Sequence, residues 1–242
     1  MERQEVRAER GQRPDSGTNA LEETLERLVR TLSIGTYMVG DKLPAERDLA
    51  VELGVSRATL RVALKELREA GIVQVTRGRY GGTEVIKQPT ERHGTEAPVS
   101  AADVDDALRF RELLDTEAAR LAAQAGLSAW QRRRLTALMR SCESAPMDQY
   151  RAFDAQFHIA ISELAGIPSL TSAVTENRAR INGLLDRIPM MGANLEHANQ
   201  QHTQILDAVL GAEPDRAAEL ARDHARGTAA LLQGFLASGA EG

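Results

Sequence analysis

Hydrophobic residues recur along this 242-residue chain with the spacing of helix faces over most of its length. Near the start, Leu21, Leu25, Leu28, Val29 and Leu32 share one face of a helix predicted over about residues 21–33. After residue 100 the pattern predicts six longer helices with short connections, at 101–125, 128–144, 148–165, 168–189, 194–211 and 214–236. Abundant Ala and Leu and an aromatic content of only 3% agree with a mainly α protein.

Between these two regions the pattern changes to short elements. Pro44 in a first helical turn and Gly54 as a C-terminal cap bracket one short helix, and a second short helix begins at the N-cap Ser56 and ends before Gly71. Two β-branched runs, 72–76 and 83–86, flank the segment RGRYGG and predict a two-stranded wing. The expected fold is an N-terminal winged helix-turn-helix followed by an all-α bundle of six or seven helices.

Composition and charge divide the chain further. Residues 1–18 have balanced charges and few apolar anchors, which predicts a disordered tail before a winged-helix domain at 19–87. Residues 88–100 contain two prolines and form an expected linker to a helical domain at 101–238. Residues 21–87 carry 11 Lys+Arg against 10 Asp+Glu, whereas residues 100–242 carry 14 against 19, so the net charge is positive only in the first of these segments.

Further features bear on location. The single cysteine, Cys142, excludes an internal disulfide. No apolar run approaches the roughly 20 residues that span a bilayer, and the charged N-terminus lacks the apolar centre of a secretion signal. We therefore expect a cytoplasmic protein with no membrane partner.

The second short helix has the chemistry of one that enters a DNA major groove. Together with the preceding helix it is expected to form an apolar inner face, made of Val51, Leu53, Val55, Leu60, Ala63, Leu64 and Leu67. Arg57 and Arg61 on the opposite face can bond guanine edges, while Ser56 and Thr59 at the helix start can bind phosphate. Candidate contacts outside this helix are Arg47 and the wing-tip residues Arg77 and Gly78. The alternative is a solvated basic face on an ordinary helical hairpin.

The segment from Leu43 to Gly71, LPAERDLAVELGVSRATLRVALKELREAG, resembles the winged-helix domain of the GntR family of bacterial repressors, with a match over about 21–86. This resemblance implies DNA contacts by Arg47, Arg57, Arg61 and Gly78, supported by Ser56, Thr59 and Arg77. Ala58 stands where a Thr or Ser is common, which removes one hydroxyl contact, and the wing tip is longer than usual.

Four polar residues lie on the apolar faces of three later helices. Asp154 and His158 are four residues apart on one helix, and His202 and His224 share the faces of Leu206 and Leu220 on two others. Buried polar groups must satisfy one another, and one divalent metal would satisfy all four. Three imidazoles and a carboxylate suit Zn²⁺, or Ni²⁺, Fe²⁺ or Mn²⁺. The alternative is separate, hydrogen-bonded histidines. His197 does not follow this pattern and is expected to be a surface residue, and His93 in the linker is expected to be inert.

The segments DAQFH (154–158), HTQILDAV (202–209) and FRELLDTEAARLAA (110–123) resemble the FCD effector domain of the FadR subfamily of GntR regulators, over roughly 103–236. This resemblance implies that Asp154, His158, His202 and His224 hold a metal and that a small organic acid binds beside it. Arg111 would face the cavity and hold a carboxylate, unless it only pairs with Asp115. Gln201 stands where the family usually has Glu.

The sequence as a whole therefore predicts a ligand-responsive regulator, in the family's usual form a repressor. A homodimer would place two winged helices on a palindromic DNA operator, and a small organic acid or sugar acid would control it. Arg178, Arg180 and Asn182 are weaker candidates for the cavity wall. Two other functions stay open: a metalloenzyme fused to a DNA-binding head, for which Glu163 or Asp207 would have to act as a base, and a metal-free sensor of acyl-CoA type.

Overall fold

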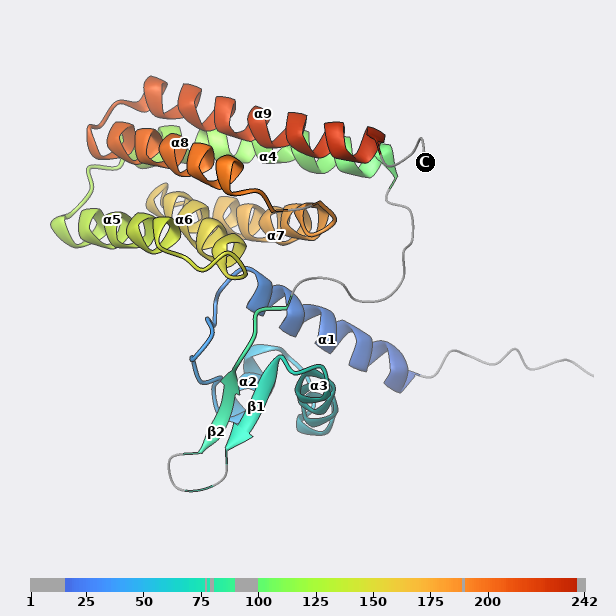
Figure 1. The fold of residues 1–242 in the computed structure, drawn as a ribbon. Coiled ribbons are helices and arrows are strands. Elements are labelled where there is room, and N and C mark those ends of the chain that lie inside the picture. Colours follow the sequence, from blue (N-terminus) through green and yellow to red (C-terminus); the bar gives the residue numbers. More distant parts are fainter. Residues whose placement is uncertain (1–15, 77, 79–80, 90–99, 189, 239–242) are drawn as a thin grey trace, which may run out of the picture.

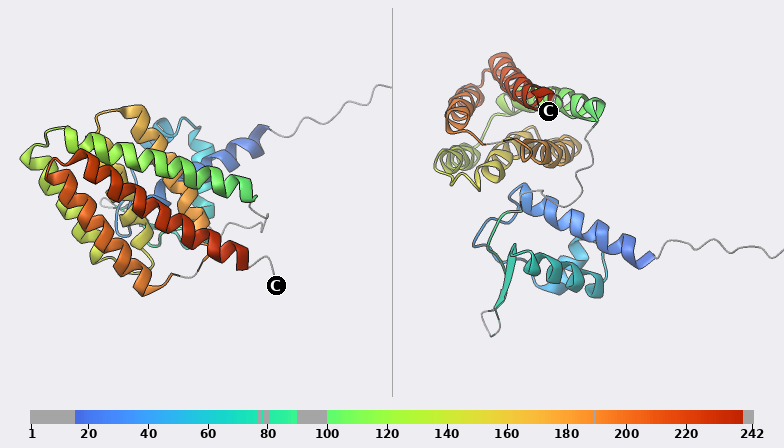
Figure 2. Two further views of the ribbon diagram at one scale, coloured as in Figure 1. Left: turned by 90° about the horizontal axis from the view of Figure 1, so that it is seen from above. Right: turned by 45° about the vertical axis from the view of Figure 1, so that its right-hand side comes forward.

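The computed structural model describes residues 16–76, 78, 81–89, 100–188 and 190–238. Most of the expected tail and linker (1–15 and 90–99) therefore lie outside the described residues, as does His93. Within the described ranges the chain forms a winged helix-turn-helix unit and a helical bundle, stacked one on the other (Figures 1 and 2). This confirms the predicted fold class. No helix of these ranges is both long and apolar enough to cross a bilayer.

Among the residues that the structure describes, the winged unit contains three helices and two strands: α1 (Ser16–Ser33), α2 (Glu46–Glu52), α3 (Arg57–Glu69), β1 (Val73–Thr76) and β2 (Gly82–Val85). β1 and β2 pair antiparallel, with Val73 opposite Val85 and Thr76 opposite Gly82. Leu28, Leu32, Leu49, Leu60 and Leu67 are among the residues of its shared core. α3 begins at its N-cap Ser56, whose hydroxyl accepts a hydrogen bond from the Thr59 amide at 3.0 Å.

Two expectations for α2 are wrong. The helix begins at Glu46, so Pro44 precedes it rather than occupying its first turn. Lys42 bridges to β2 and the Leu43 amide bonds Thr83 O at 2.8 Å, which keeps this stretch extended. Val51 is 78% exposed and does not belong to the inner face. Leu49 and Ala50 fill that face instead, and the next residue is turned about 100° away from Ala50 around the helix.

The bundle contains six helices in the described residues: α4 (Ala101–Gln124), α5 (Ala129–Glu143), α6 (Tyr150–Leu164), α7 (Pro168–Leu185), α8 (Gly192–Leu210) and α9 (Pro214–Ser238). α4 packs along α9 and also contacts α6, α7 and α8. α4, α8 and α9 form one layer, and α5, α6 and α7 form the layer nearer the winged unit (Figure 1).

The bundle helices follow the sequence closely, with some shorter ends. The capping box of Ser128 and Gln131 is present at the start of α5. α7 ends at Leu185 and not at 189. Ile188 directly precedes a proline in the sequence, and the helical conformation is disfavoured at a residue in that position, which argues against a helix that continues to 189.

The two units are joined where α1 ends. Ile34 is 5% exposed and packs in a cluster with Leu114, Ala155 and Ile159 of the bundle. Gln156 of α6 donates a hydrogen bond to Ile34 O at 2.5 Å. Helix α6 therefore touches the winged unit directly, and the same helix carries two candidate metal ligands.

Candidate functional site

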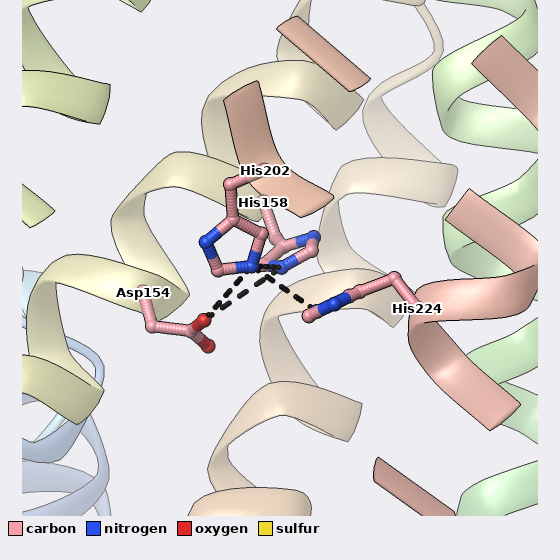
Figure 3. A group of neighbouring side chains, drawn as sticks. All are labelled: Asp154, His158, His202 and His224. Atoms are coloured by element: carbon pink, nitrogen blue, oxygen red, sulfur yellow. Dashed lines mark hydrogen bonds and ion pairs between the residues drawn. The ribbon is translucent and has the colours of Figure 1, made fainter. Parts of the chain in front are cut away.

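The structure brings the four candidate metal ligands together in the middle of the bundle (Figure 3). Asp154 and His158 come from α6, His202 from α8 and His224 from α9. One ligand atom from each residue lies within 4.8 Å of those of the other three. The three histidines are buried, at 0–4% exposure. Residues as far apart as 154 and 224 in the sequence thus form one cluster.

The distances in the cluster resemble those between ligands of a shared ion. His202 Nε2 lies 3.2 Å from His158 Nε2, 3.1 Å from His224 Nε2 and 3.3 Å from Asp154 Oδ1. A neutral imidazole nitrogen either donates or accepts one hydrogen bond, so it cannot satisfy three neighbours at once. Ligands about 2.0–2.1 Å from a tetrahedral Zn²⁺ are separated by roughly 3.3 Å. The residues present therefore fit a divalent metal.

Burial keeps these histidines in the form that binds metals. Desolvation lowers the pKa of His202 to about 4. It also lowers the pKa of His158 and of His224 well below the usual value, and nearby Arg178 and His202, respectively, act in the same direction. At neutral pH the three imidazoles are uncharged, so their lone pairs are available to an ion.

The three imidazoles differ in the surroundings of their other ring nitrogen, Nδ1. His224 Nδ1 lies 2.9 Å from Gln201 Oε1, and since an amide oxygen only accepts, the proton sits on Nδ1 and leaves Nε2 unprotonated. His158 Nδ1 lies at the longer distance of 3.8 Å from Asp115 Oδ2. His202 Nδ1 is buried with no hydrogen-bond partner in the described residues. Gln201 therefore supports His224 with a neutral acceptor.

A buried ionic network lies against the cluster. Asp115 accepts hydrogen bonds from Arg111 Nε at 3.2 Å and from Arg178, and Arg178 also reaches Asp154 Oδ2 at 3.3 Å. Arg111 Nη2 lies 3.1 Å from His224 Nε2, while Arg111 Nη1 is buried without a partner among the described atoms. Arg111 thus pairs with Asp115 and also faces the cluster, so the two roles considered for it are compatible.

A cavity of about 340 Å³ adjoins the cluster. Its wall includes Arg111, Asp154 and His224, together with Tyr150, Arg151, Leu185, Asn194, Leu195, His197, Ala198, Gln201, Gly227, Thr228 and Leu231. His197 is exposed, as expected, but it contributes to this wall. Sequence reasoning missed Tyr150 and Arg151, although they precede Asp154 by four and three residues and so share its face of α6.

None of the three weaker candidates on α7, Arg178, Arg180 and Asn182, lines this cavity, although Leu185 of the same helix does. Arg178 is 1% exposed beneath the cluster, and burial, reinforced by Arg111, lowers its pKa to about 10. Arg180 pairs with Asp106 at 2.8 Å on the outer surface.

The two carboxylates considered as enzymatic bases do not line the cavity either. Glu163 pairs with Arg134 at 2.5 Å, and Asp207 is exposed. The described cavity wall therefore contains Asp154 as its one carboxylate, and Asp154 is itself a candidate metal ligand.

In the winged unit, α3 presents a cationic outer face. Arg57 and Arg61 are exposed, and Arg61 Nε lies 2.6 Å from Glu46 Oε2 of α2. Arg57 has no ion-pair partner in the described part of the chain. Ser56 and Thr59 bond each other through their hydroxyls at 2.7 Å beside the helix start. The cationic face therefore lies on α3, and Arg57 is its cation without an ion-pair partner among the described residues.

The remaining DNA candidates lie beside this face or on the wing. Arg47 is exposed and its Nε lies 3.0 Å from Asp48 Oδ1. Gly78 has a φ of +117°, a backbone conformation that side chains disfavour, and its carbonyl accepts from the Gly81 amide at 2.9 Å. Arg77 lies outside the described residues.

A winged helix-turn-helix joined to a helical bundle, with a buried Asp/His cluster and an adjoining cavity, is the architecture of a ligand-responsive DNA-binding regulator. The chain belongs to the GntR family of bacterial regulatory proteins and carries an FCD domain: residues 21–85 match the former family model and residues 106–227 match the latter. Both resemblances noted in the sequence are thereby confirmed. The family and its relatives are transcriptional regulators and not enzymes.

Individual relatives agree with this assignment. The HTH-type transcriptional regulator RmpR of Mycobacterium gastri is 32% identical over 84% of this chain and 76% of its own length. The Glc operon transcriptional activator of Escherichia coli K12 is 30% identical over 84% of each chain. The HTH-type transcriptional repressor NanR of Cronobacter sakazakii is 26% identical over 88% of this chain and 84% of its own. Among solved structures, E. coli McbR/YncC has a TM-score of 0.56 at 20% identity, covers 89% of this chain and 98% of its own, and shows the same fold.

Proposed function

We propose that this regulator is a repressor whose bundle holds a divalent metal and a small carboxylate metabolite, and that this effector releases it from DNA. The observation that carries the proposal is the convergence of three neutral, buried imidazoles and one carboxylate beside a cavity that also contains Arg111. We also propose the division into a DNA-binding domain at 19–87 and an effector domain at 101–238.

The proposed metal ligands are Asp154, His158, His202 and His224. This set suits Zn²⁺, and Ni²⁺, Fe²⁺ and Mn²⁺ bind similar donors. When bound, the ion would supply positive charge, and an oxygen of the effector would join the four protein ligands by raising the coordination number of the ion. Asp154 is held toward the cluster by Arg178, and Gln201 holds His224 with its Nε2 unprotonated.

Arg111 is the proposed partner of the effector's carboxylate. Its Nη1 is buried and has no partner among the described atoms, which is costly unless a ligand supplies an acceptor. Asp115 fixes the other edge of the guanidinium through Nε. A carboxylate oxygen accepting from Arg111 would relieve that cost and would lie next to His224.

The proposed DNA contacts are Arg47, Ser56, Arg57, Thr59, Arg61, Arg77 and Gly78. Arg57 and Arg61 project from the exposed face of α3, the position of a recognition helix in the major groove. One winged helix reads one half-site, so we propose a homodimer on a palindromic operator.

Two experiments test this function. Selection of bound sequences from random double-stranded DNA should return a palindrome, and recovery of no consensus would contradict the DNA assignment. A thermal-shift screen of zinc-loaded protein against small carboxylates and sugar acids should then find a stabilising ligand. Absence of any hit in protein of confirmed zinc content would contradict the carboxylate assignment, and protein that stays metal-free after incubation with Zn²⁺ or Ni²⁺ would favour a metal-free sensor.

A further inference from the structure

The wall of the effector cavity contains a second arginine, Arg151 of α6. Its Nε lies 2.7 Å from Asp186 Oδ1, and its Nη2 donates a hydrogen bond to Leu185 O at 2.5 Å. The side chain is 18% exposed. A guanidinium carries five N–H donors, so these two contacts leave donors for a ligand.

We propose that Arg151 binds a second anionic group of the effector, which makes the effector a dicarboxylate or a related dianion. This inference rests on the proposed function, in which Arg111 holds the first carboxylate. On this proposal, Arg151 makes the bundle prefer effectors with two anionic groups over effectors with one.

The charges of the cavity wall support a dianion. The wall contains two arginines, Arg111 and Arg151, against the single carboxylate of Asp154. That carboxylate is already engaged by Arg178. Asp186, the partner of Arg151, does not line this cavity but lines a second cavity, to whose wall Arg151 also contributes. A ligand in the effector cavity would therefore compete with Asp186 for the guanidinium of Arg151 without lying against that carboxylate itself.

Arg151 also connects the effector cavity to the DNA-binding unit. The second cavity, of about 230 Å³, lies at the joint between the units and is lined by Arg151, Asp186, Ser33 and Asn182, among others. Asn182 Nδ2 lies 3.4 Å from both Arg151 O and Ser33 O, which couples α6 to the last residue of α1.

Ala152, the next residue of α6, lies against the chain just after α1. A Cβ added at Gly35 would lie only 3.0 Å from Ala152 O, so the backbones of the two units approach closely there. A ligand that draws Arg151 away from Asp186 would therefore act on the part of α6 that holds the end of α1.

The test compares acids of equal chain length with one or two carboxylates. Zinc-loaded full-length protein is titrated calorimetrically with malonate, succinate and glutarate, and with propionate, butyrate and valerate as the matched monoacids. We expect the wild type to prefer at least one diacid over its matched monoacid. Arg151→Ala should weaken that diacid by about tenfold or more, the loss of a charged hydrogen bond. The same variant should leave the monoacid nearly unchanged, whereas Arg111→Ala should weaken both.

Two further variants guard against simple misfolding. Asp186→Asn removes the anion that competes for Arg151, so it should tighten diacid binding severalfold, a gain that damage to the fold would not produce. Arg151→Lys keeps the cation and should retain part of the diacid preference. Zinc content and melting temperature are measured for every variant.

The joint itself is followed by hydrogen exchange of residues 31–36. A saturating diacid should change exchange there in the wild type and not in Arg151→Ala. Unchanged exchange in the wild type would overturn the connection to the DNA-binding unit.

The outcomes separate this inference from the proposed function. Monoacid binding without any diacid preference, or a diacid preference that survives in Arg151→Ala, overturns the role of Arg151 and leaves the carboxylate site standing. Equal loss of both classes in Arg151→Ala, with normal zinc content and melting temperature, also overturns it. Binding of neither class by the wild type overturns the carboxylate site, and the Arg151 inference with it.

Discussion

Replacing His202 by alanine should abolish most of the stabilisation that zinc gives the bundle. His202 Nε2 is the central atom of the cluster, within 3.3 Å of the ligand atoms of Asp154, His158 and His224. A metal that binds only the folded protein stabilises it by about 2.7 kcal/mol at a free concentration one hundred times its Kd. For a chain of 242 residues, each kcal/mol shifts the melting temperature by roughly 2–4 °C. The expected zinc-induced shift of the wild type is therefore about 5–10 °C.

The loss in the variant follows from the number of ligands. Zinc sites with four protein ligands bind with about 10–16 kcal/mol in total, or roughly 3 kcal/mol for each ligand. Loss of one ligand therefore weakens binding by roughly a hundredfold. At the same free zinc concentration, His202→Ala would be only about half occupied and would gain less than about 1 kcal/mol. Its melting temperature should then rise by no more than about 2 °C.

The assay is differential scanning calorimetry in a zinc-buffered solution, with chelator-treated protein as the baseline. His197→Ala is the matched control, because His197 lies on the same helix, α8, but is exposed and outside the cluster. The control should show the wild-type shift. An equal shift in His202→Ala and in the wild type would refute the assignment of His202 as a ligand.

Three further predictions concern other parts of the account. Arg57→Ala should weaken operator binding by about 1–3 kcal/mol, while Arg68→Ala, near the far end of α3, should change it little. Fluorescence anisotropy measures both affinities. Equal losses in the two variants would contradict the assignment of Arg57 to the DNA-recognition face. Gln201→Glu should tighten zinc binding by about tenfold or more, because a charged hydrogen-bond acceptor makes His224 a stronger zinc ligand. Competition with a chelating dye measures the zinc affinity, and weaker binding in the variant would contradict the role of residue 201 in supporting His224. Metal-free protein should lose stability as pH falls from about 6.5 to about 4, since below pH 6.5 the unfolded chain binds protons that folded His202, with its pKa lowered to about 4, does not. Urea titrations along this range should show a loss on the order of 3 kcal/mol from His202, and a flat profile would contradict its burial as a neutral imidazole.

Helix periodicity explains why the metal-ligand candidates could be chosen from the sequence. Asp154 and His158 are one turn apart, and His202 and His224 lie on faces made apolar by their neighbours, so a polar cluster in the core followed from the pattern alone. The pattern could not supply the distances, because these depend on how three separate helices pack. Nor could it show that Arg111 bonds Asp115 and faces the cluster at once.

The same periodicity limits what sequence reasoning can assign. Arg178 and Arg180 are two residues apart, which places them about 200° apart around α7, so they cannot face one cavity together. Asn182 shares the face of Arg178 but lies about 6 Å further along the helix, where α7 meets the end of α1. Arg151 was missed because a charged residue near a helix start is ordinarily solvent-exposed, and the role proposed for it follows only from the two cavities that it lines.

The most direct test of the account is operator affinity measured with and without the effector. Zinc-loaded wild type and His202→Ala are titrated with labelled operator, in the presence and absence of the carboxylate found in the thermal-shift screen. We predict that the carboxylate weakens operator binding of the wild type by about tenfold, a coupling in the ordinary range for linked sites, and leaves His202→Ala unchanged. A carboxylate that binds the wild-type bundle tightly while operator affinity stays constant would contradict the claim that the bundle controls the DNA-binding unit.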